Sequence, residues 1–278
     1  MRLVSFEADG KPMAGIRIGD EVAALGDPAT GMKGLLAAGP KAIEAMAAHA
    51  PRRKLSSVTL LPPVRHPGKI ICIGLNYALH AKEGNNPIPD YPAIFLRAGT
   101  SLVAPGAAMI RPKASDKFDY EAELAVIIGR RCRNVSEAQA LDCVGGYSCF
   151  NEGSIRDFQR KSTQWGAGKN FDGTGAFGPE IVTPDELPPG ADNLRIMTRL
   201  NGETMQDSTT GDMIFKVANI VATLSVIMTL EPGDVIATGT PSGVGYARKP
   251  PRFLTPGDTV EVEIERIGVL RNPVADEA

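Results

Sequence analysis

Two glutamates, Glu121 and Glu123, lead into an apolar run at residues 124–128 that is rich in β-branched side chains and is stopped by a glycine. Such a run predicts a strand buried on both faces. Because side chains alternate along a strand, the two carboxylates point to one face, roughly 6.6 Å apart. An unpaired buried charge is costly to desolvate, and divalent cations prefer oxygen ligands. The pair therefore indicates a metal site, with a solvated edge strand as the alternative.

A second stretch of the chain shows the pattern that a solvated strand would have. Residues 260–265 alternate strictly between a β-branched apolar residue and glutamate. Strict alternation predicts a half-exposed antiparallel strand whose glutamates face water. The stretch at residues 121–128 differs because its apolar run continues on both faces.

A histidine and a glutamate three residues apart, His80 and Glu83, follow a buried strand that we expect at residues 69–74. On a helical turn the two side chains share a face, where the carboxylate fixes the imidazole tautomer and raises its basicity. A general base needs this arrangement. The bare H-x-x-E spacing favours a surface pair instead, but the position after the end of a strand, where loops commonly carry function, strengthens the case for a base.

A polar stripe follows the strand that we expect at residues 144–150. In helical geometry Glu152, Arg156 and Gln159 fall at i, i+4 and i+7, which places them on one face. A functional face and a solvated helix face both explain this stripe. A longer helix, amphipathic to buried, is predicted at residues 213–229.

Two glycine-rich segments carry single polar residues of interest. Residues 165–173 surround Lys169, but the glycine spacing and the residue after the lysine exclude a phosphate-binding P-loop. The loop at residues 239–245 offers backbone N–H groups and the hydroxyl of Thr240 to an anion such as a carboxylate. A tight connection without a ligand is the alternative for this loop.

Composition indicates a soluble globular protein with a full core. The chain has 278 residues, of which 43% are hydrophobic and 22% charged, and its net charge is −2. This balance gives no electrostatic reason to expect a nucleic-acid or membrane partner. The apolar runs are too short to span a bilayer, and we expect no signal peptide before the strand-like residues 2–6. The cysteines lack C-x-x-C spacing and predict reduced core residues of a cytoplasmic protein: Cys72, Cys132, Cys143 and Cys149.

The order of the predicted elements indicates two domains. Residues 1–25 predict short strands and hairpins, two short helices follow, and the proline-rich residues 62–67 form a stiff connection. We therefore predict a small N-terminal α/β domain at residues 1–66 and a catalytic domain at residues 67–278.

Five segments resemble, in order, the motifs of the fumarylacetoacetate hydrolase family. They are GLNYALHAKE at 74–83, YEAELAVIIG at 120–129, NEGSIRD at 151–157, GKNFD at 168–172 and TGTPSGVG at 238–245. The family patterns that they resemble are G-x-N-Y-x-x-H-x-x-E, E-x-E-L, N-D-x-S-x-R-D, G-K-S-F-D and T-G-T-P-x-G-V-G. The resemblance covers about residues 69–272, and five motifs in the correct order make chance agreement implausible.

The resemblance implies a β-rich α+β fold, which is a mixed β-sandwich roll with flanking helices, and a homodimer. It implies a divalent cation, usually Mg²⁺ or Mn²⁺, with Ca²⁺ able to occupy the same site. The metal ligands that it implies are Glu121, Glu123 and Glu152. It makes His80 the base and Glu83 the group that orients it. The residues that it implies for stabilising negative charge and for holding a substrate carboxylate are Arg156, Gln159, Lys169 and Thr240.

Three positions depart from the family patterns. Glu152 stands where aspartate is more frequent, Leu79 replaces a frequent aspartate, and Asn170 replaces serine. Glu152 is one methylene longer than aspartate, and Gly153 could accommodate it through an unusual backbone angle. The alternative is that Glu152 pairs with Arg156, four residues on, and holds no metal.

The chemistry that the resemblance implies acts on 2-oxo acids. We predict a metal-dependent hydrolase that cleaves a C–C bond of an acylpyruvate-like substrate, with His80 taking a proton from water. Stabilisation of an enolate by Lys169 and Arg156 serves the alternatives equally. These are a decarboxylase or isomerase of 2-oxo-dienoates or oxaloacetate, and a ureidoglycolate-type lyase. A catalytically silent protein that binds a 2-oxo acid is a different class. The presence of every motif argues against it, because a binding protein has no need for a histidine base and its carboxylate partner.

Overall fold

Strands dominate the computed structural model, which describes residues 1–25 and 31–278. The larger sheet is 12-stranded in this part of the chain, and one path through it runs from β4 to β7. Along that path lie β4 (Arg52–Lys54), β3 (Glu21–Leu25), β2 (Lys11–Ile18), β1 (Arg2–Ala8), β14 (Gly175–Val182), β12 (Val144–Glu152), β11 (Ala122–Ile128), β17 (Val235–Ala237), β6 (Ile70–Gly74) and β7 (Ala93–Arg97). The two remaining strands are β5 (Thr59–Leu61), which pairs with β1, and β8 (Leu102–Val103), which pairs with β14.

Two further sheets complete the β structure. The five-stranded sheet contains, in order, β16 (Glu203–Thr209), β15 (Arg195–Leu200), β18 (Thr259–Ile264), β19 (Gly268–Asp276) and β9 (Met109–Arg111). The short strands β10 (Phe118–Asp119) and β13 (Ser154–Ile155) pair with each other. Most neighbours are antiparallel, but β17 and β6 are parallel, so the large sheet is mixed.

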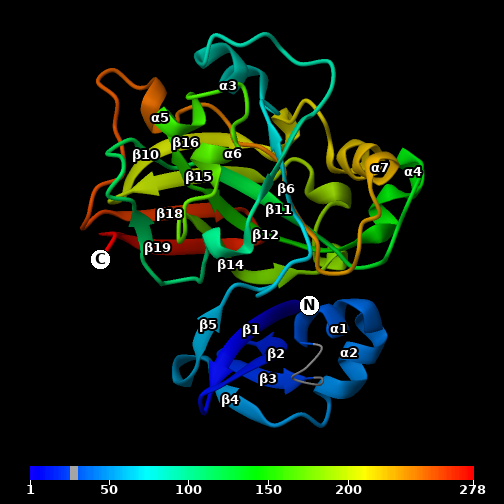
Figure 1. The fold of residues 1–278 in the computed structure, drawn as a ribbon. Coiled ribbons are helices and arrows are strands. Elements are labelled where there is room, and N and C mark those ends of the chain that lie inside the picture. Colours follow the sequence, from blue (N-terminus) through cyan, green and yellow to red (C-terminus); the bar gives the residue numbers. More distant parts are fainter. Residues whose placement is uncertain (26–30) are drawn as a thin grey trace.

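Short helices flank the sheets. They are α1 (Gly31–Ala38), α2 (Pro40–Ala47), α3 (Ala78–Glu83), α4 (Glu137–Ala140), α5 (Arg156–Gln159), α6 (Gly166–Lys169) and α7 (Val217–Ile227). In Figure 1, α4 and α7 lie together at one side of the upper body, and α3 and α5 lie near its top. This arrangement confirms the predicted β-rich α+β class with a mixed sandwich roll and flanking helices. None of the helices in the described residues has both the length and the apolar character needed to cross a membrane.

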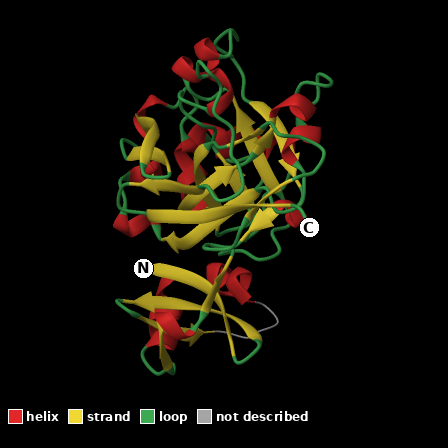
Figure 2. Cartoon of the chain, turned by 90° about the vertical axis from the view of Figure 1, so that its left-hand side faces the viewer, coloured by secondary structure: helices red, strands yellow, loops and turns green. Residues whose placement is uncertain are grey.

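The strands β1–β5 form a separate lower body with α1 and α2, as both views show (Figures 1 and 2). The two bodies are joined by pairing of β1 with β14, where Arg2 lies opposite Val182 and Leu3 opposite Ile181. The predicted boundary at residue 66 stays a prediction, since the large sheet continues through this pairing.

The two strands contrasted in the sequence behave as expected. All residues of β11 are buried, because the strand lies between β12 and β17 and is covered on both faces. In β18 the apolar residues are buried and Glu261 and Glu263 are partly exposed. The cysteines are free and buried, as predicted.

One predicted helix is present but shorter than expected, and one helical interpretation was wrong. The helix predicted at residues 213–229 begins only at Val217, because Asn76 holds the preceding segment extended: its side-chain oxygen accepts from the Phe215 N–H at 2.7 Å. The stripe that was to include Glu152 is not a helix face. Glu152 is the last residue of β12, with its N–H bonded to the carbonyl of Glu121, and α5 begins at Arg156.

Candidate active site

A cavity of about 670 Å³ lies in the upper body, between the end of β6, α3, α5, α6 and the loop that follows β17. Every side chain that the sequence singled out for catalysis, substrate binding or metal binding lines it. These residues are His80, Glu83, Glu121, Glu123, Glu152, Arg156, Gln159, Lys169 and Thr240. The structure therefore brings the complete predicted set together, while the role of each residue remains a proposal.

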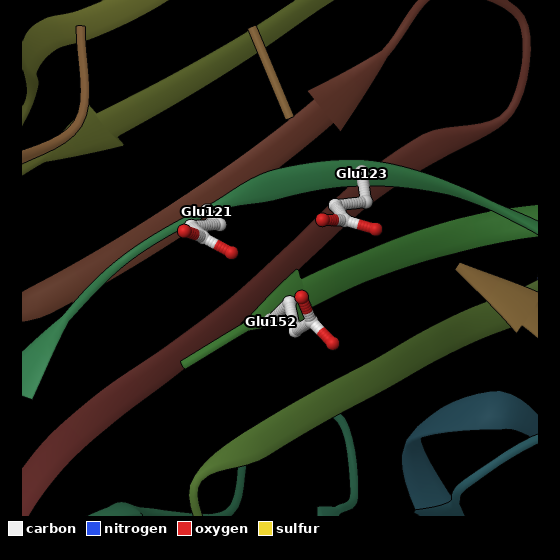
Figure 3. A group of neighbouring side chains, drawn as sticks. All are labelled: Glu121, Glu123 and Glu152. Atoms are coloured by element: carbon white, nitrogen blue, oxygen red, sulfur yellow. The ribbon is translucent and has the colours of Figure 1, made fainter. Parts of the chain in front are cut away.

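Three carboxylates form a cluster at the base of the cavity. Glu121 precedes β11, Glu123 lies in β11, and Glu152 ends the neighbouring strand β12, so adjacent antiparallel strands bring them together (Figure 3). One oxygen from each lies within 4.8 Å of the others, and all three side chains are buried.

Two buried cations neutralise part of this cluster. The Lys169 ammonium lies 2.6 Å from Glu121 Oε2 and 2.8 Å from Glu152 Oε2. The Arg156 guanidinium lies 2.6 Å from Glu121 Oε1. Burial opposes the charge on Glu121, but Arg156 and then Lys169 outweigh it, so the pKa of Glu121 lies well below its ordinary value. Glu123 is different: burial, then repulsion from Glu152 and Glu121, raise its pKa well above the ordinary value.

Glu123 and Glu152 have carboxylate oxygens that Lys169 and Arg156 do not neutralise, and these oxygens suit a hard divalent cation. Glu123 accepts one hydrogen bond from a backbone N–H, that of Gly239 at 2.9 Å. Glu152 Oε1 is buried without a hydrogen-bond partner. Buried oxygens of this kind need a compensating charge, and an all-oxygen donor set suits Mg²⁺, Mn²⁺ or Ca²⁺.

The predicted contact between His80 and Glu83 is formed. His80 and Glu83 share a face of α3, with Nδ1 of His80 2.8 Å from Glu83 Oε1. The carboxylate is fixed in turn by the Gly243 N–H, which donates to Glu83 Oε2 at 3.0 Å. Because Nδ1 is engaged with a carboxylate, Nε2 is the nitrogen left to exchange a proton with a substrate. His80 is not part of the carboxylate cluster, so the predicted base is distinct from the candidate metal ligands.

Residues 69–275 match the sequence model for the fumarylacetoacetate (FAA) hydrolase C-terminal region. The chain belongs to the fumarylacetoacetate hydrolase family. A curated relative, the mitochondrial oxaloacetate tautomerase of Rattus norvegicus, is 42% identical over 287 residues, covering 99% of this chain and 91% of the relative.

Solved structures of family members have the same fold. The fumarylacetoacetate hydrolase of the psychrophile Exiguobacterium antarcticum is 37% identical with a TM-score of 0.87, and the match covers 100% of both chains. Maleylpyruvate hydrolase of Sphingobium sp. SYK-6, in complex with manganese(II) and pyruvate, is 31% identical with a TM-score of 0.84, also over 100% of both chains. These matches support an enzyme of this family.

Asp119 was not singled out from the sequence. Its side chain is fully buried beside the site. It accepts hydrogen bonds from Nε of Arg156 at 2.8 Å and from the backbone N–H groups of Gly245 and Tyr246 at 2.8 and 3.0 Å. Asp119 thus ties Arg156 to the loop that carries Thr240. Its place two residues before Glu121 is the signal that could have revealed it.

The environment of Glu152 differs from the expectation in two ways. Gly153 does not have the unusual backbone angle suggested for it; a Cβ there would lie 1.9 Å from the carbonyl oxygen of Thr174, so close packing requires the glycine. Glu152 also forms no ion pair with Arg156. It pairs with Lys169, and Arg97 lies 3.8 Å away, because the strand end points it into the cluster.

We expect Glu152→Gln to weaken Mn²⁺ binding more than Glu152→Asp does. Glutamine keeps the length but removes the charge, whereas aspartate keeps the charge at a shorter reach. A ligand's loss should exceed the roughly tenfold to 100-fold that loss of an outer-sphere partner costs. Isothermal titration of both variants with Mn²⁺ measures the difference. Wild-type affinity in both would show that Glu152 does not hold the metal.

Proposed function

We propose that the protein is a metal-dependent tautomerase or isomerase of a 2-oxo acid of the oxaloacetate type. The observation that carries the proposal is one oriented base, His80 with Glu83, lining the same cavity as a buried carboxylate cluster and its two cations. The name of the rat relative, which matches over 99% of this chain, favours this reading over the C–C hydrolase expected from the sequence.

The side chains can divide the work of keto–enol exchange as follows. Glu121, Glu123 and Glu152 would hold Mg²⁺ or Mn²⁺, which when bound supplies Lewis-acid polarisation of the substrate carbonyl. His80 would carry a proton between C3 and the C2 oxygen of the substrate, and Glu83 would stabilise the imidazolium that forms in between. Isomerisation of an oxo-dienoate needs a base of the same kind, which takes a proton from one position of the substrate and returns it to a carbon atom.

The remaining polar groups would bind the substrate and stabilise its charge. The Lys169 ammonium and the Arg156 guanidinium donate hydrogen bonds to the oxygen that becomes negative in the enolate. Gln159, held by a 3.0 Å hydrogen bond from Arg156 Nη1, extends this polar wall. Thr240, whose Oγ1 accepts from Gln206 Nε2 at 2.8 Å, is placed to donate its own proton to a substrate carboxylate.

Hydrolysis of an acylpyruvate is the second candidate. Two solved relatives named as hydrolases support it, and His80 could take a proton from water instead of from carbon. The stabilised enolate would then be the leaving group of C–C cleavage. Decarboxylation and ureidoglycolate-type lysis use the same stabilisation of negative charge, but no particular feature of this site favours them.

The reaction is tested with Mg²⁺ or Mn²⁺ and a panel of enol-oxaloacetate, acylpyruvates and ureidoglycolate. We expect faster loss of enol absorbance with oxaloacetate and no appearance of CO₂ or of two acid products. Two acid products from an acylpyruvate would support the hydrolase, and CO₂ release a decarboxylase. No turnover of any substrate would contradict both enzymatic proposals and favour a protein that only binds 2-oxo acids.

Assembly and location are also proposals. The homodimer implied by the family resemblance stays a prediction. The four free, buried cysteines fit a compartment in which thiols remain reduced. We propose the cytoplasm, while the rat relative is named as mitochondrial.

A further inference from the structure

The cavity has a second group of cations, which have no acidic partners in the described residues. Arg160, Arg248 and Lys249 line it together with the site residues. At the base, Arg156 and Lys169 each pair with Glu121. Within residues 1–25 and 31–278, by contrast, no carboxylate forms an ion pair with Arg160, Arg248 or Lys249. Charged groups that share a cavity but have no counter-charge are suited to bind an anionic group of a ligand.

Two of these cations are held in place by neutral groups. The Arg160 guanidinium stacks on the ring of Tyr246, 4.5 Å from its centroid, and Arg156 lies at the same distance from that ring. Arg248 donates from Nη2 to the Met205 carbonyl at 2.6 Å. These contacts fix the guanidinium groups without neutralising them, so their charge stays available to a ligand.

Adjacent residues of β16 fix the two ends of the loop that follows β17. The Met205 carbonyl holds Arg248, and the Gln206 side chain donates to Thr240 Oγ1 at 2.8 Å. Consecutive Cα atoms are about 3.8 Å apart. Strand β16 therefore fixes the spacing between the Met205 carbonyl, which holds Arg248, and the Gln206 side chain, which holds Thr240. Thr240 is the proposed site of one substrate carboxylate, and Arg248 lines the same cavity.

We propose that Arg248, with Arg160 and Lys249, binds the second carboxylate of a dicarboxylic 2-oxo acid. This inference rests on the proposed function, because it takes the 2-oxo acid end of the substrate to lie at the carboxylate cluster and Thr240. A guanidinium offers a carboxylate two parallel N–H donors, which gives orientation as well as affinity. Arg248 then selects dicarboxylic over monocarboxylic 2-oxo acids.

The test is equilibrium binding of two unreactive analogues in the presence of Mg²⁺. L-malate and L-lactate share the 2-hydroxy acid end, and malate adds the distal carboxylate. We expect the wild-type protein to bind malate about tenfold or more tightly than lactate, the range of one charge-assisted hydrogen bond. This measurement needs ligand binding and no catalytic turnover. The binding result therefore remains informative even if oxaloacetate is not turned over.

Variants assign the preference to residues. Arg248→Gln and Arg160→Gln should each reduce the ratio of the lactate and malate dissociation constants, and Arg248→Lys should restore part of it. The control is Arg131→Gln, which removes the same charge from an exposed pair with Glu231 outside the cavity and should leave the ratio unchanged. Thermal unfolding confirms that each variant is folded. In the described residues the Arg160 side chain makes no hydrogen bond to the backbone, so its variant tests the proposal if Arg248→Gln does not fold.

Two results would overturn the proposal. The first is equal affinity of the wild-type protein for malate and lactate. The second is an equal loss of affinity for both ligands in Arg248→Gln and Arg160→Gln, because the cations would then attract any anion without reading the distal carboxylate. Failure of the tautomerase assay with an intact malate preference would instead contradict only the proposed reaction.

Discussion

Glu123→Gln should abolish metal-dependent turnover while leaving the metal-free fold at least as stable as the wild type. Glu123 is buried and accepts one backbone hydrogen bond, from Gly239, which the glutamine oxygen can also accept. The substitution therefore removes a charge without removing a packing or hydrogen-bond partner. We expect Mn²⁺ affinity to fall by more than the roughly tenfold to 100-fold typical of outer-sphere losses. Isothermal titration, an activity assay and thermal unfolding in a chelator measure the three effects.

The pH dependence of stability gives this prediction a second readout. The pKa of Glu123 is raised in the folded protein by burial, and by Glu152 and Glu121. Since the folded state binds the proton more tightly than the unfolded state, this group stabilises the fold below its ordinary pKa. That contribution is lost as the pH rises through the raised folded pKa. Without metal, the stability difference between wild type and Glu123→Gln should therefore shift in favour of the variant as the pH rises.

Glu121→Gln is the informative comparison, because it removes a ligand and a structural ion pair together. Glu121 pairs with Arg156 and Lys169, both buried. Removing one partner of a buried pair costs up to about 3–5 kcal/mol; here Arg156 keeps Asp119 and Lys169 keeps Glu152, so the expected loss lies at the lower end. Glu121→Gln should thus lose metal and stability, whereas Glu123→Gln loses metal alone. Full activity after exhaustive chelation, or wild-type metal affinity in Glu123→Gln, would contradict the metal assignment.

Local pattern in the sequence was sufficient to predict that Glu121 and Glu123 lie together on a buried strand. An apolar run on both faces of 124–128 required a central strand, and the structure places β11 between two others. The period of a strand then put Glu121 and Glu123 on one side. His80 and Glu83 were equally local, since three residues on a helical turn determine their contact.

Glu152 shows where local reasoning failed. Its spacing from Arg156 and Gln159 suited a helix, but the N–H of Glu152 bonds to the carbonyl of Glu121, which extends the sheet pairing past residue 151. A hydrogen bond between segments 31 residues apart has no signature in a short window of sequence. The positions of Arg248 and Asp119 at the cavity could not be predicted for the same reason. Both side chains are held by contacts with strands and loops that are distant in the sequence.

His80→Ala should lower the rate of proton transfer by about two to four decades, the usual range for loss of a general base. Metal affinity should not change, because His80 lies outside the group of side chains whose oxygens could hold an ion. Steady-state kinetics and isothermal titration with Mn²⁺ on the same preparation separate the two effects. The fold should tolerate the change, since the imidazole is bonded to Glu83 at the wall of a cavity and not packed within the core.

Glu83→Gln is the matched control for this prediction. The single amide oxygen of glutamine can take the place of Oε1, which lies 2.8 Å from His80 Nδ1 and 3.2 Å from the Gly243 nitrogen, so the contact with His80 is kept while the charge that stabilises an imidazolium is removed. Its rate should fall less than that of His80→Ala, because the imidazole is still present and only the charge that supports its protonated form is removed. Loss of metal in His80→Ala would show that base and ligand are not separate. Retention of the wild-type rate would show that another group moves the proton.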